Sequence, residues 1–101
     1  MNPNSKAKVL YVDDESINLR LFKISFRANY DIHTALSAEE GLLLIRDLPY
    51  FDIIVSDQRM PGKSGTEFMI QAKKTLPNAK YILLTGYTDI EALENAINKV
   101  G

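Results

Sequence analysis

Short apolar runs alternate along this chain with longer segments in which apolar residues recur at helical spacing. An unbroken apolar run of a few residues is typical of a strand buried on both faces, as strands are in parallel sheets. Strands that alternate with helices predict an α/β domain, built as an open parallel sheet with helices on both faces. The runs are residues 9–12, 53–55 and 81–84, with a weaker alternating run at 30–35 that we place at an edge of the sheet.

The helical segments between and after these runs have recognisable starts. Two of them open with the spacing of a capping box, which marks where a helix begins: Ser37 with Glu40, and Thr88 with Glu91. The first segment carries an apolar stripe of the kind that faces a core. The stripe consists of Ile17, Leu21, Ile24 and Ala28, widened by Leu19, Phe22 and Phe26. The segments are residues 16–28, 37–45, 65–76 and 88–100.

Length and composition exclude several classes of protein. The 101 residues suffice for one domain, so we expect a single unit over 1–101, with residues 1–8 as a flexible polar lead-in. The formal net charge of −1 argues against broad binding to nucleic acid or to an anionic membrane. The absence of cysteine excludes disulfides, zinc–thiolate sites and thiol nucleophiles. No apolar run approaches the ~20 residues that span a bilayer, and no signal peptide is recognisable, so a cytoplasmic location is expected.

Acidic and hydroxyl side chains follow three of the four predicted strands. They are Asp13 and Asp14 after the first run, Asp57 after the third and Thr85 after the fourth. Open parallel sheets bind ligands outside the carboxyl ends of their strands, so these side chains are expected to share one rim. Carboxylate oxygens suit Mg²⁺, which the three acids can hold directly or through water. A carboxylate beside such a metal can attack phosphorus to form an aspartyl phosphate, with Thr85 donating a hydrogen bond to a phosphoryl oxygen.

Single residues in this set also have simpler explanations. One Asp at a strand end is more often a turn residue or a helix cap. An acid pair, a third acid and a hydroxyl, each at the end of a strand, favour one functional cluster over four separate caps. Among the other polar residues, Glu15 is expected to be a solvated first-turn residue, Ser56 a structural one and His33 an exposed one.

Three sequence blocks carry the acids and the threonine. They read V-L-Y-V-D-D-E at residues 9–15, D-Q-R-M-P-G at 57–62 followed by Gly65, and L-L-T-G at 83–86. In this order and spacing they resemble the receiver domain of two-component response regulators, over nearly the whole chain. The resemblance implies a flavodoxin-like, doubly wound parallel sheet with the strand order 2-1-3-4. It also implies that Pro61 and Gly62 form the turn that shapes the loop after Asp57.

The resemblance implies a role for each residue of the acid cluster. Asp57 is similar to the phosphoacceptor, which takes a phosphoryl group from a phosphohistidine on a sensor histidine kinase or a phosphotransfer protein. Asp13 and Asp14 are similar to the acid pair that holds Mg²⁺, together with Asp57 and the backbone carbonyl of Arg59. The chain would then be a signalling domain that catalyses only its own phosphorylation and dephosphorylation.

The neighbours of the phosphoacceptor have implied roles in switching and in rate. Thr85 resembles the hydroxyl that moves towards the phosphoryl group. Arg59 and Tyr87 occupy the two variable positions that tune how fast the group is gained and lost. Phosphorylation adds about −1.5 to −2 charges. The expected output is a changed surface around residues 88–100, which an output domain or a partner protein recognises, without direct contact to nucleic acid.

The sequence also departs from this family. Receivers have a fifth strand and a fifth helix, and a lysine near the end of that strand contacts the phosphoryl group. This sequence has neither the fifth strand and helix nor that lysine. Lys99 cannot be the lysine, because it falls in the last predicted helix. A charge-assisted hydrogen bond is worth roughly 1.5–3 kcal/mol, so phosphorylation, or the response to it, is expected to be impaired while Mg²⁺ binding persists. An uncovered strand edge and sheet face predict a homodimer or domain-swapped oligomer. Whether the end at Gly101 is natural stays open.

Two other functions stay open from the residues alone. The first is a receiver-like interaction module that is never phosphorylated, which the missing lysine favours and the intact acids oppose. The second is a phosphatase or phosphotransferase with an Asp nucleophile. Such enzymes usually place their acids as D-x-D after the first strand, and Asp13-Asp14-Glu15 does not have that spacing.

Overall fold

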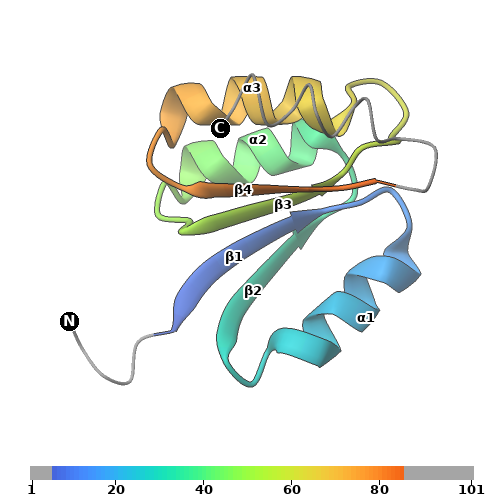
Figure 1. Cartoon of the computed structure of the whole chain (residues 1–101), viewed down its shortest axis with the longest axis vertical. Coiled ribbons are helices and arrows are strands. Elements are labelled where there is room, and N and C mark those ends of the chain that lie inside the picture. The colour runs from blue at the N-terminus through green and yellow to red at the C-terminus, as the bar shows by residue number, and fades with distance from the viewer. Residues whose placement is uncertain (1–5, 86–101) are drawn as a thin grey trace.

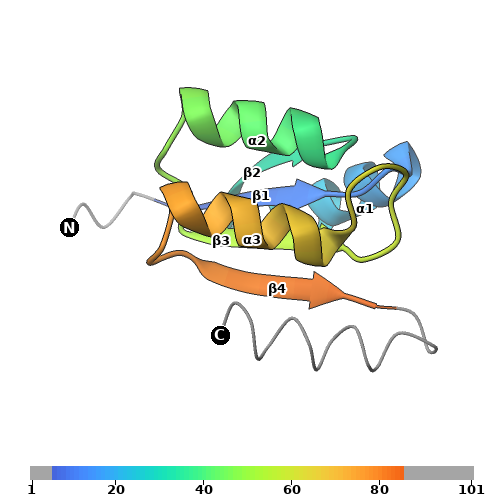
Figure 2. The ribbon, with the colours of Figure 1, turned by 90° about the horizontal axis from the view of Figure 1, so that it is seen from above.

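The computed structural model describes residues 6–85, which form a four-stranded parallel sheet with helices on both faces. Helix α1 covers one face, and α2 and α3 lie side by side on the other (Figure 1, Figure 2). The predicted α/β class and the layered arrangement are confirmed. In chain order the elements are β1 (Ala7–Val12), α1 (Ser16–Phe26), β2 (Tyr30–Ala35), α2 (Ala38–Asp47), β3 (Ile53–Asp57), α3 (Gly65–Thr75) and β4 (Lys80–Leu84).

The strands lie in the order β2-β1-β3-β4, and all neighbouring pairs are parallel. This order confirms the 2-1-3-4 prediction and places the weak run at 30–35 at one edge. In the register of the sheet, Val12 lies opposite Ala35 on one side and Ser56 on the other. Asp57 pairs with Leu84 on β4. The carboxyl ends of all four strands therefore meet at one rim, and any residue that follows a strand emerges there.

The sheet divides the apolar core into two layers. The larger layer lies between the sheet and α2 and α3, where Leu10, Ile54 and Phe68 are fully buried. The smaller layer lies under α1 and includes Val9 and Tyr11. Successive residues of a strand point to opposite faces, so Tyr11 is on the α1 side of β1 while Leu10 is on the other. The side chain of Tyr11 therefore points to the face of the sheet that α1 covers.

Side-chain caps mark the starts of α2 and α3. Ser37 Oγ accepts a hydrogen bond from the backbone N–H of Glu40 at 3.1 Å, as the sequence spacing predicted. In α3 the cap is Ser64, which forms a full capping box with Glu67. These caps supply partners for N–H groups that the first turn of a helix leaves unpaired. The third capping pair, Thr88 with Glu91, falls outside the described residues, as does the helix predicted at 88–100.

Strand β1 begins at Ala7, so the predicted lead-in of residues 1–8 extends too far. Ala7 and Lys8 already pair with β2, and Lys8 Nζ lies 2.9 Å from Asp31 Oδ2. The prediction failed because polar residues at the start of a strand look like a tail when their partners are unknown. His33 is also less exposed than expected, with 31% of its side chain accessible. Its ring stacks edge-on against Phe51, with centroids 5.3 Å apart.

The apolar stripe predicted on α1 faces outward. Ile17, Leu21 and Ile24 are each more than half exposed, at 60%, 56% and 54%. The inward side of α1 carries Leu19, which is buried, and Phe22, which packs on the same core layer. Both sets recur at helical spacing, and α1 can turn only one of them to the sheet. The other set forms an exposed apolar stripe, which we call the α1 stripe (Ile17, Leu21 and Ile24).

Beside α1, the same face of the sheet is open in the described part of the chain. Phe22 and Phe26 of α1, with Val55 of β3 and Ile82 and Leu84 of β4, line an apolar hollow of about 220 Å³. Ile82 and Leu84 are 47% and 40% exposed. Within residues 6–85, no strand pairs with the outer edge of β4. No helix in that range is both long and apolar enough to cross a membrane.

Candidate functional site

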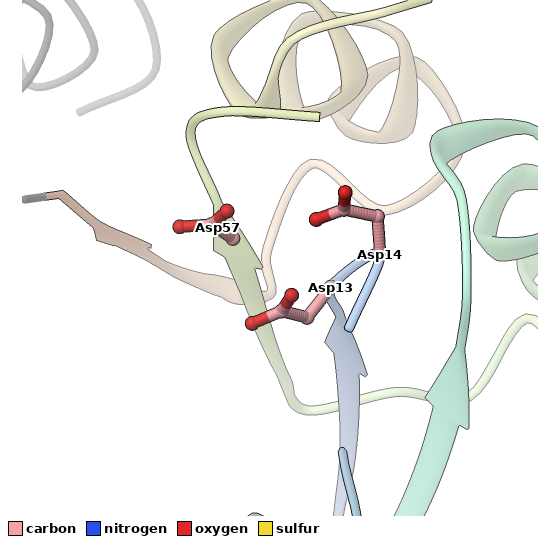
Figure 3. A group of neighbouring side chains, drawn as sticks. All are labelled: Asp13, Asp14 and Asp57. Carbon is pink, nitrogen blue, oxygen red and sulfur yellow. The ribbon is translucent and has the colours of Figure 1, made fainter. Parts of the chain in front are cut away.

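Three carboxylates converge at the rim formed by the strand ends (Figure 3). Asp13 and Asp14 follow β1, and Asp57 is the last residue of β3. One oxygen from each lies within 4.8 Å of the others. Asp13 is buried, Asp57 half-buried and Asp14 exposed, so the cluster is open to solvent on one side. The structure therefore brings together the three acids that the sequence singled out.

Three donors fix the buried member of this cluster. Asp13 Oδ2 accepts hydrogen bonds from the Tyr11 hydroxyl at 2.6 Å and from Asn18 Nδ2 at 3.1 Å. Asp13 Oδ1 accepts one from the backbone N–H of Glu15 at 2.9 Å. Each donor comes from a different part of the chain: the strand before the acids, the loop after them and the first turns of α1. Asp13 is consequently held in one orientation before any ligand arrives.

Tyr11 is the most enclosed of these donors, with only 4% of the residue exposed. Burial, followed by the hydrogen bond and the charge of Asp13, raises the pKa of Tyr11 above its ordinary value. The hydroxyl therefore stays protonated at neutral pH and can donate to Asp13. Its ring packs against Phe22, with centroids 4.4 Å apart, at one end of an aromatic row that continues through Phe26 to Tyr30.

Asp57 is positioned by an unusually close approach between β3 and the start of α3. A Cβ atom at Gly65 would overlap the Asp57 carbonyl oxygen and lie 2.6 Å from Leu83 Cδ1. Only glycine leaves room for both neighbours. The Gly65 N–H donates to the carbonyl of Gln58 at 3.0 Å, which ties the start of the helix to the residue after Asp57.

The loop between Asp57 and α3 is shaped at two points. Gly62 has φ = 80°, in the left-handed region that favours glycine, as expected for the turn predicted at Pro61 and Gly62. The Gln58 side chain accepts two hydrogen bonds from Thr66, one from its backbone N–H and one from its hydroxyl, each at 2.9 Å. Gln58 and Gly62 together hold the loop against the first turn of α3, beside the acid cluster.

The geometry of the cluster fits a hydrated magnesium ion. Mg²⁺ binds oxygen ligands at about 2.0–2.1 Å, so two protein oxygens in its inner shell are at most about 4.2 Å apart. The spread of up to 4.8 Å among the three carboxylates suits a set in which one acid acts through a bound water. All three ligands are hard oxygens, and exposed Asp14 leaves room for the waters that Mg²⁺ retains.

The other predicted residues lie around the cluster to different degrees. Thr85 directly follows β4, whose last residue pairs with Asp57, so Thr85 is half-buried at the same rim. Arg59 is exposed in the loop after Asp57, and Tyr87 falls outside the described residues. Ser56 is fully buried and donates to the Asp57 carbonyl at 2.9 Å, which is the structural role expected of it.

Two residues of the site were missed from the sequence. Tyr11 falls inside the apolar run at residues 9–12, and neither Tyr11 nor Asn18 is assigned to the site from the sequence. A signal for Tyr11 was present, because residues two apart on a strand point to the same face and Asp13 follows Tyr11 at that spacing. No comparable signal existed for Asn18, whose contact depends on how α1 leaves the acid loop.

Matches to known proteins agree with this geometry. The family model for the response regulator receiver domain matches residues 9–101. The chain therefore belongs to the response regulator receiver domain family, the signalling modules of two-component systems. Its acid cluster at the sheet rim is the acidic pocket of such a domain.

The chain is also similar to individual proteins and solved structures. The chain is 33% identical over 98 residues to the hydrogenase transcriptional regulatory protein HoxA of Cupriavidus necator, covering 97% of this chain and 20% of that protein. It thus spans about a fifth of that regulator. A receiver domain protein from Clostridium thermocellum superposes with a TM-score of 0.89 at 31% identity, covering 94% of this chain and 77% of that one. The BeF3-activated DrrB receiver domain gives a TM-score of 0.81 at 27% identity, covering 94% and 79%.

Proposed function

We propose that Asp57 accepts a phosphoryl group from a phosphohistidine of a sensor histidine kinase or phosphotransfer protein, in the presence of Mg²⁺. The observation that carries this proposal is the convergence of Asp13, Asp14 and Asp57 within 4.8 Å at the rim. In the transfer, a carboxylate oxygen of Asp57 forms the new bond to phosphorus. The bond from phosphorus to the histidine nitrogen breaks, and the imidazole leaves with the electron pair.

The residues of the site have different roles in this transfer. Asp13, Asp14, the Asp57 carboxylate and the Arg59 backbone carbonyl would hold the ion. The ion would supply positive charge to offset the oxygens of the transferring group. Asp13 is oriented by its three donors, so its carboxylate needs no rearrangement at the moment of reaction. Exposed Asp14 faces the side from which a donor protein and its phosphohistidine approach.

The response to phosphorylation belongs to residues beside the acids. Thr85, half-buried where β4 ends, moves towards the phosphoryl group and donates its hydroxyl to a phosphoryl oxygen. Arg59 and Tyr87, two residues after Asp57 and two after Thr85 in the sequence, tune the rates at which the phosphoryl group is gained and lost. The changed surface is read by an output domain or a partner protein in the cytoplasm, and nucleic acid is not contacted directly.

The α1 stripe supports a docking place for the donor protein. Ile17 lies in the first turn of α1, directly after the acid loop, and Leu21 and Ile24 continue the stripe along the helix. An exposed apolar row on a helix commonly marks a contact with another protein, since such rows are unfavourable in water. A partner helix laid along this stripe would reach the rim where Asp57 is presented.

The open face of the sheet supports self-association. Ile82 and Leu84 present apolar side chains beside an unpaired edge of β4, within residues 6–85. Unpaired edges and apolar patches favour pairing with a further chain. This feature also favours the second candidate function, an interaction module that is not phosphorylated, because protein contact alone would use it.

Intact mass spectrometry distinguishes the two functions. The protein is incubated with Mg²⁺ and acetyl phosphate, and the expected result is one added phosphoryl group that Asp57→Asn abolishes. Asp52→Asn is the matched control, because Asp52 precedes β3 at the opposite end of the strand. No added mass in a sample whose circular dichroism shows a folded α/β chain contradicts the phosphoacceptor role and favours the interaction module.

A further inference from the structure

A hollow lined by four cationic side chains lies where β1 begins and α1 ends (Figure 1). Lys6 directly precedes β1, and Lys8 is the second residue of that strand. Lys23 lies in the last turn of α1, and Arg27 is the residue that ends the helix. The hollow has a volume of about 520 Å³. It is at the opposite end of β1 from the acid cluster, so the two sites are separate.

The positive charge around this hollow is only partly neutralised. Among the described residues that line it, Asp31 is the only carboxylate, and its Oδ2 already lies 2.9 Å from Lys8 Nζ. Within residues 6–85, the side chains of Lys23 and Arg27 form no ion pair. In a chain whose formal net charge is −1, the hollow is therefore a local excess of positive charge.

The end of the helix explains part of this charge. Cations are favourable near the C-terminus of a helix, and Lys6 Nζ donates to the Arg27 carbonyl at 3.2 Å. That bond serves the helix end with one lysine and does not require the others. Lys23 and Arg27 are four residues apart on one side of α1, where like charges repel each other. An anion between these side chains and Lys6 would relieve the repulsion.

The side chains around the hollow indicate which kind of anion fits. An arginine guanidinium donates hydrogen bonds in a fork that matches phosphate, and lysines add point charges. The volume of the hollow falls within the range of about 300–1,000 Å³ that is usual for small-molecule sites. It can therefore admit a phosphate together with the molecule that carries it. Tyr30, which is 36% exposed, adds an aromatic ring to the wall, and such rings pack well against other flat rings.

We propose that this hollow binds a soluble phosphate ester that carries an aromatic ring, with a nucleoside diphosphate as the representative ligand. Lys23 and Arg27 hold the phosphate groups, Lys6 adds a third positive charge, and the ring of the ligand lies against Tyr30. The bound ligand ties the end of α1 to the start of β1. This binding goes beyond the proposed phosphoryl transfer and does not depend on it.

The test is calorimetric titration of the unmodified protein with ADP. EDTA is present, so that no divalent ion can link the phosphates to the acid cluster. The double variant Lys23→Gln/Arg27→Gln is expected to weaken ADP binding about tenfold or more, because it removes two charge-assisted contacts. The matched control is Arg46→Gln/Lys74→Gln, which removes the same two kinds of charge from exposed positions on α2 and α3. Its affinity for ADP should be unchanged.

A second comparison tests the recognition of the ring. Tyr30→Leu is expected to weaken ADP binding about two- to tenfold and to leave the affinity for pyrophosphate unchanged. Tyr50→Leu is the control, because Tyr50 is 67% exposed in the segment between α2 and β3, away from the hollow. Adenosine, which has the ring but no phosphate, should not bind measurably.

The other outcomes each contradict the proposal. An unmodified protein that does not bind ADP overturns it. Equal weakening in the two double variants shows that overall charge attracts the anion and that the hollow does not. Pyrophosphate that binds as tightly as ADP shows that the ring is not recognised. Cosedimentation with phosphatidylglycerol vesicles, without ADP binding, identifies a membrane contact in place of a soluble ligand.

The variant Asp57→Asn separates this proposal from the proposed function. It removes the phosphoacceptor and should leave the affinity for ADP unchanged, because Asp57 lies at the opposite end of the sheet. Loss of ADP binding in Asp57→Asn would place the ligand at the acid cluster and overturn the assignment to the hollow. Failure of the protein to accept a phosphoryl group, with ADP binding retained, would contradict the proposed function alone.

Discussion

Gly65 lies so close to Asp57 that any side-chain carbon at residue 65 would overlap the Asp57 carbonyl oxygen. The start of α3 and the end of β3 are thus joined without a gap. Gly65→Ala is expected to destabilise the fold by about 1–3 kcal/mol, because backbone must shift to admit the methyl group. The shift displaces Asp57, so Mg²⁺ affinity and phosphorylation by acetyl phosphate are expected to fall as well. Chemical denaturation and the mass assay measure the two effects.

Gly41→Ala is the control for this experiment. Its new carbon would lie 3.0 Å from side-chain atoms of Phe68 and Val12 rather than against backbone. It is expected to destabilise the core and to leave phosphorylation of the folded protein intact. Equal phosphorylation of the two variants would contradict the positional role given to Gly65.

The α1 stripe gives a prediction about the phosphodonor. Leu21→Glu places a charge in the middle of the stripe, at a residue that is already 56% exposed, so the fold is expected to tolerate it. Phosphotransfer from an autophosphorylated sensor histidine kinase should slow at least tenfold, while phosphorylation by acetyl phosphate should not change. Leu43→Glu, on α2 and 50% exposed, is the control. If both variants are equally slow with the kinase, the stripe is not the docking surface.

The open sheet face gives a prediction about self-association. Sedimentation over a range of concentrations is expected to show dimers or larger species, because Ile82 and Leu84 adjoin an edge with no strand partner in the described residues. Ile82→Lys should shift the population to monomer, since it places a charge on this face. Ile70→Lys, on α3 and 38% exposed, should have no effect. A monomer at every concentration would refute the prediction.

The ion pair at the opposite end of the sheet predicts a pH dependence. The hydrogen bond from Lys8 is the main reason that the pKa of Asp31 is lowered. A carboxyl with a lowered folded-state pKa adds stability above its unfolded value of about 3.9, and this stability is lost as pH falls through the folded value. Asp31→Asn is therefore expected to lower the free energy of unfolding by about 0.2–1 kcal/mol at pH 7, the usual range for an exposed pair.

The difference between Asp31→Asn and the unmodified protein should shrink as pH falls below 4. Urea unfolding at pH 7, 5 and 3.5 measures it. Asp47→Asn is the control, because its pair with Arg46 is more exposed, with 71% and 64% of the two side chains accessible. A difference that stays constant down to pH 3.5 would show that the Asp31 charge does not stabilise the fold.

Much of the fold and of the acid cluster could be predicted from the sequence, because both follow from local patterns. Unbroken apolar runs such as residues 53–55 indicate buried parallel strands, and parallel strands bring their following residues to one rim. Asp13, Asp14 and Asp57 could be grouped by that rule without any knowledge of side-chain directions.

The features that were not predicted depend on packing between elements, which the periodicity of the sequence does not determine. Ile17 and Leu21 have the same helical spacing as the inward residues Leu19 and Phe22, and only packing against the sheet selects between the two sets. The failure at the start of β1 is similar, because Lys8 is recognisable as a strand residue only once Asp31 is known to lie beside it.

The row of rings that begins at Tyr11 has a practical consequence. The chain contains no tryptophan, so its near-ultraviolet circular dichroism arises from tyrosine and phenylalanine alone. Tyr11 stacks on Phe22 at one end and donates to Asp13 at the other. A change at the carboxylate therefore alters the environment of a chromophore that is already in contact with it. The domain carries its own optical reporter of the acid site, which can be read without a label.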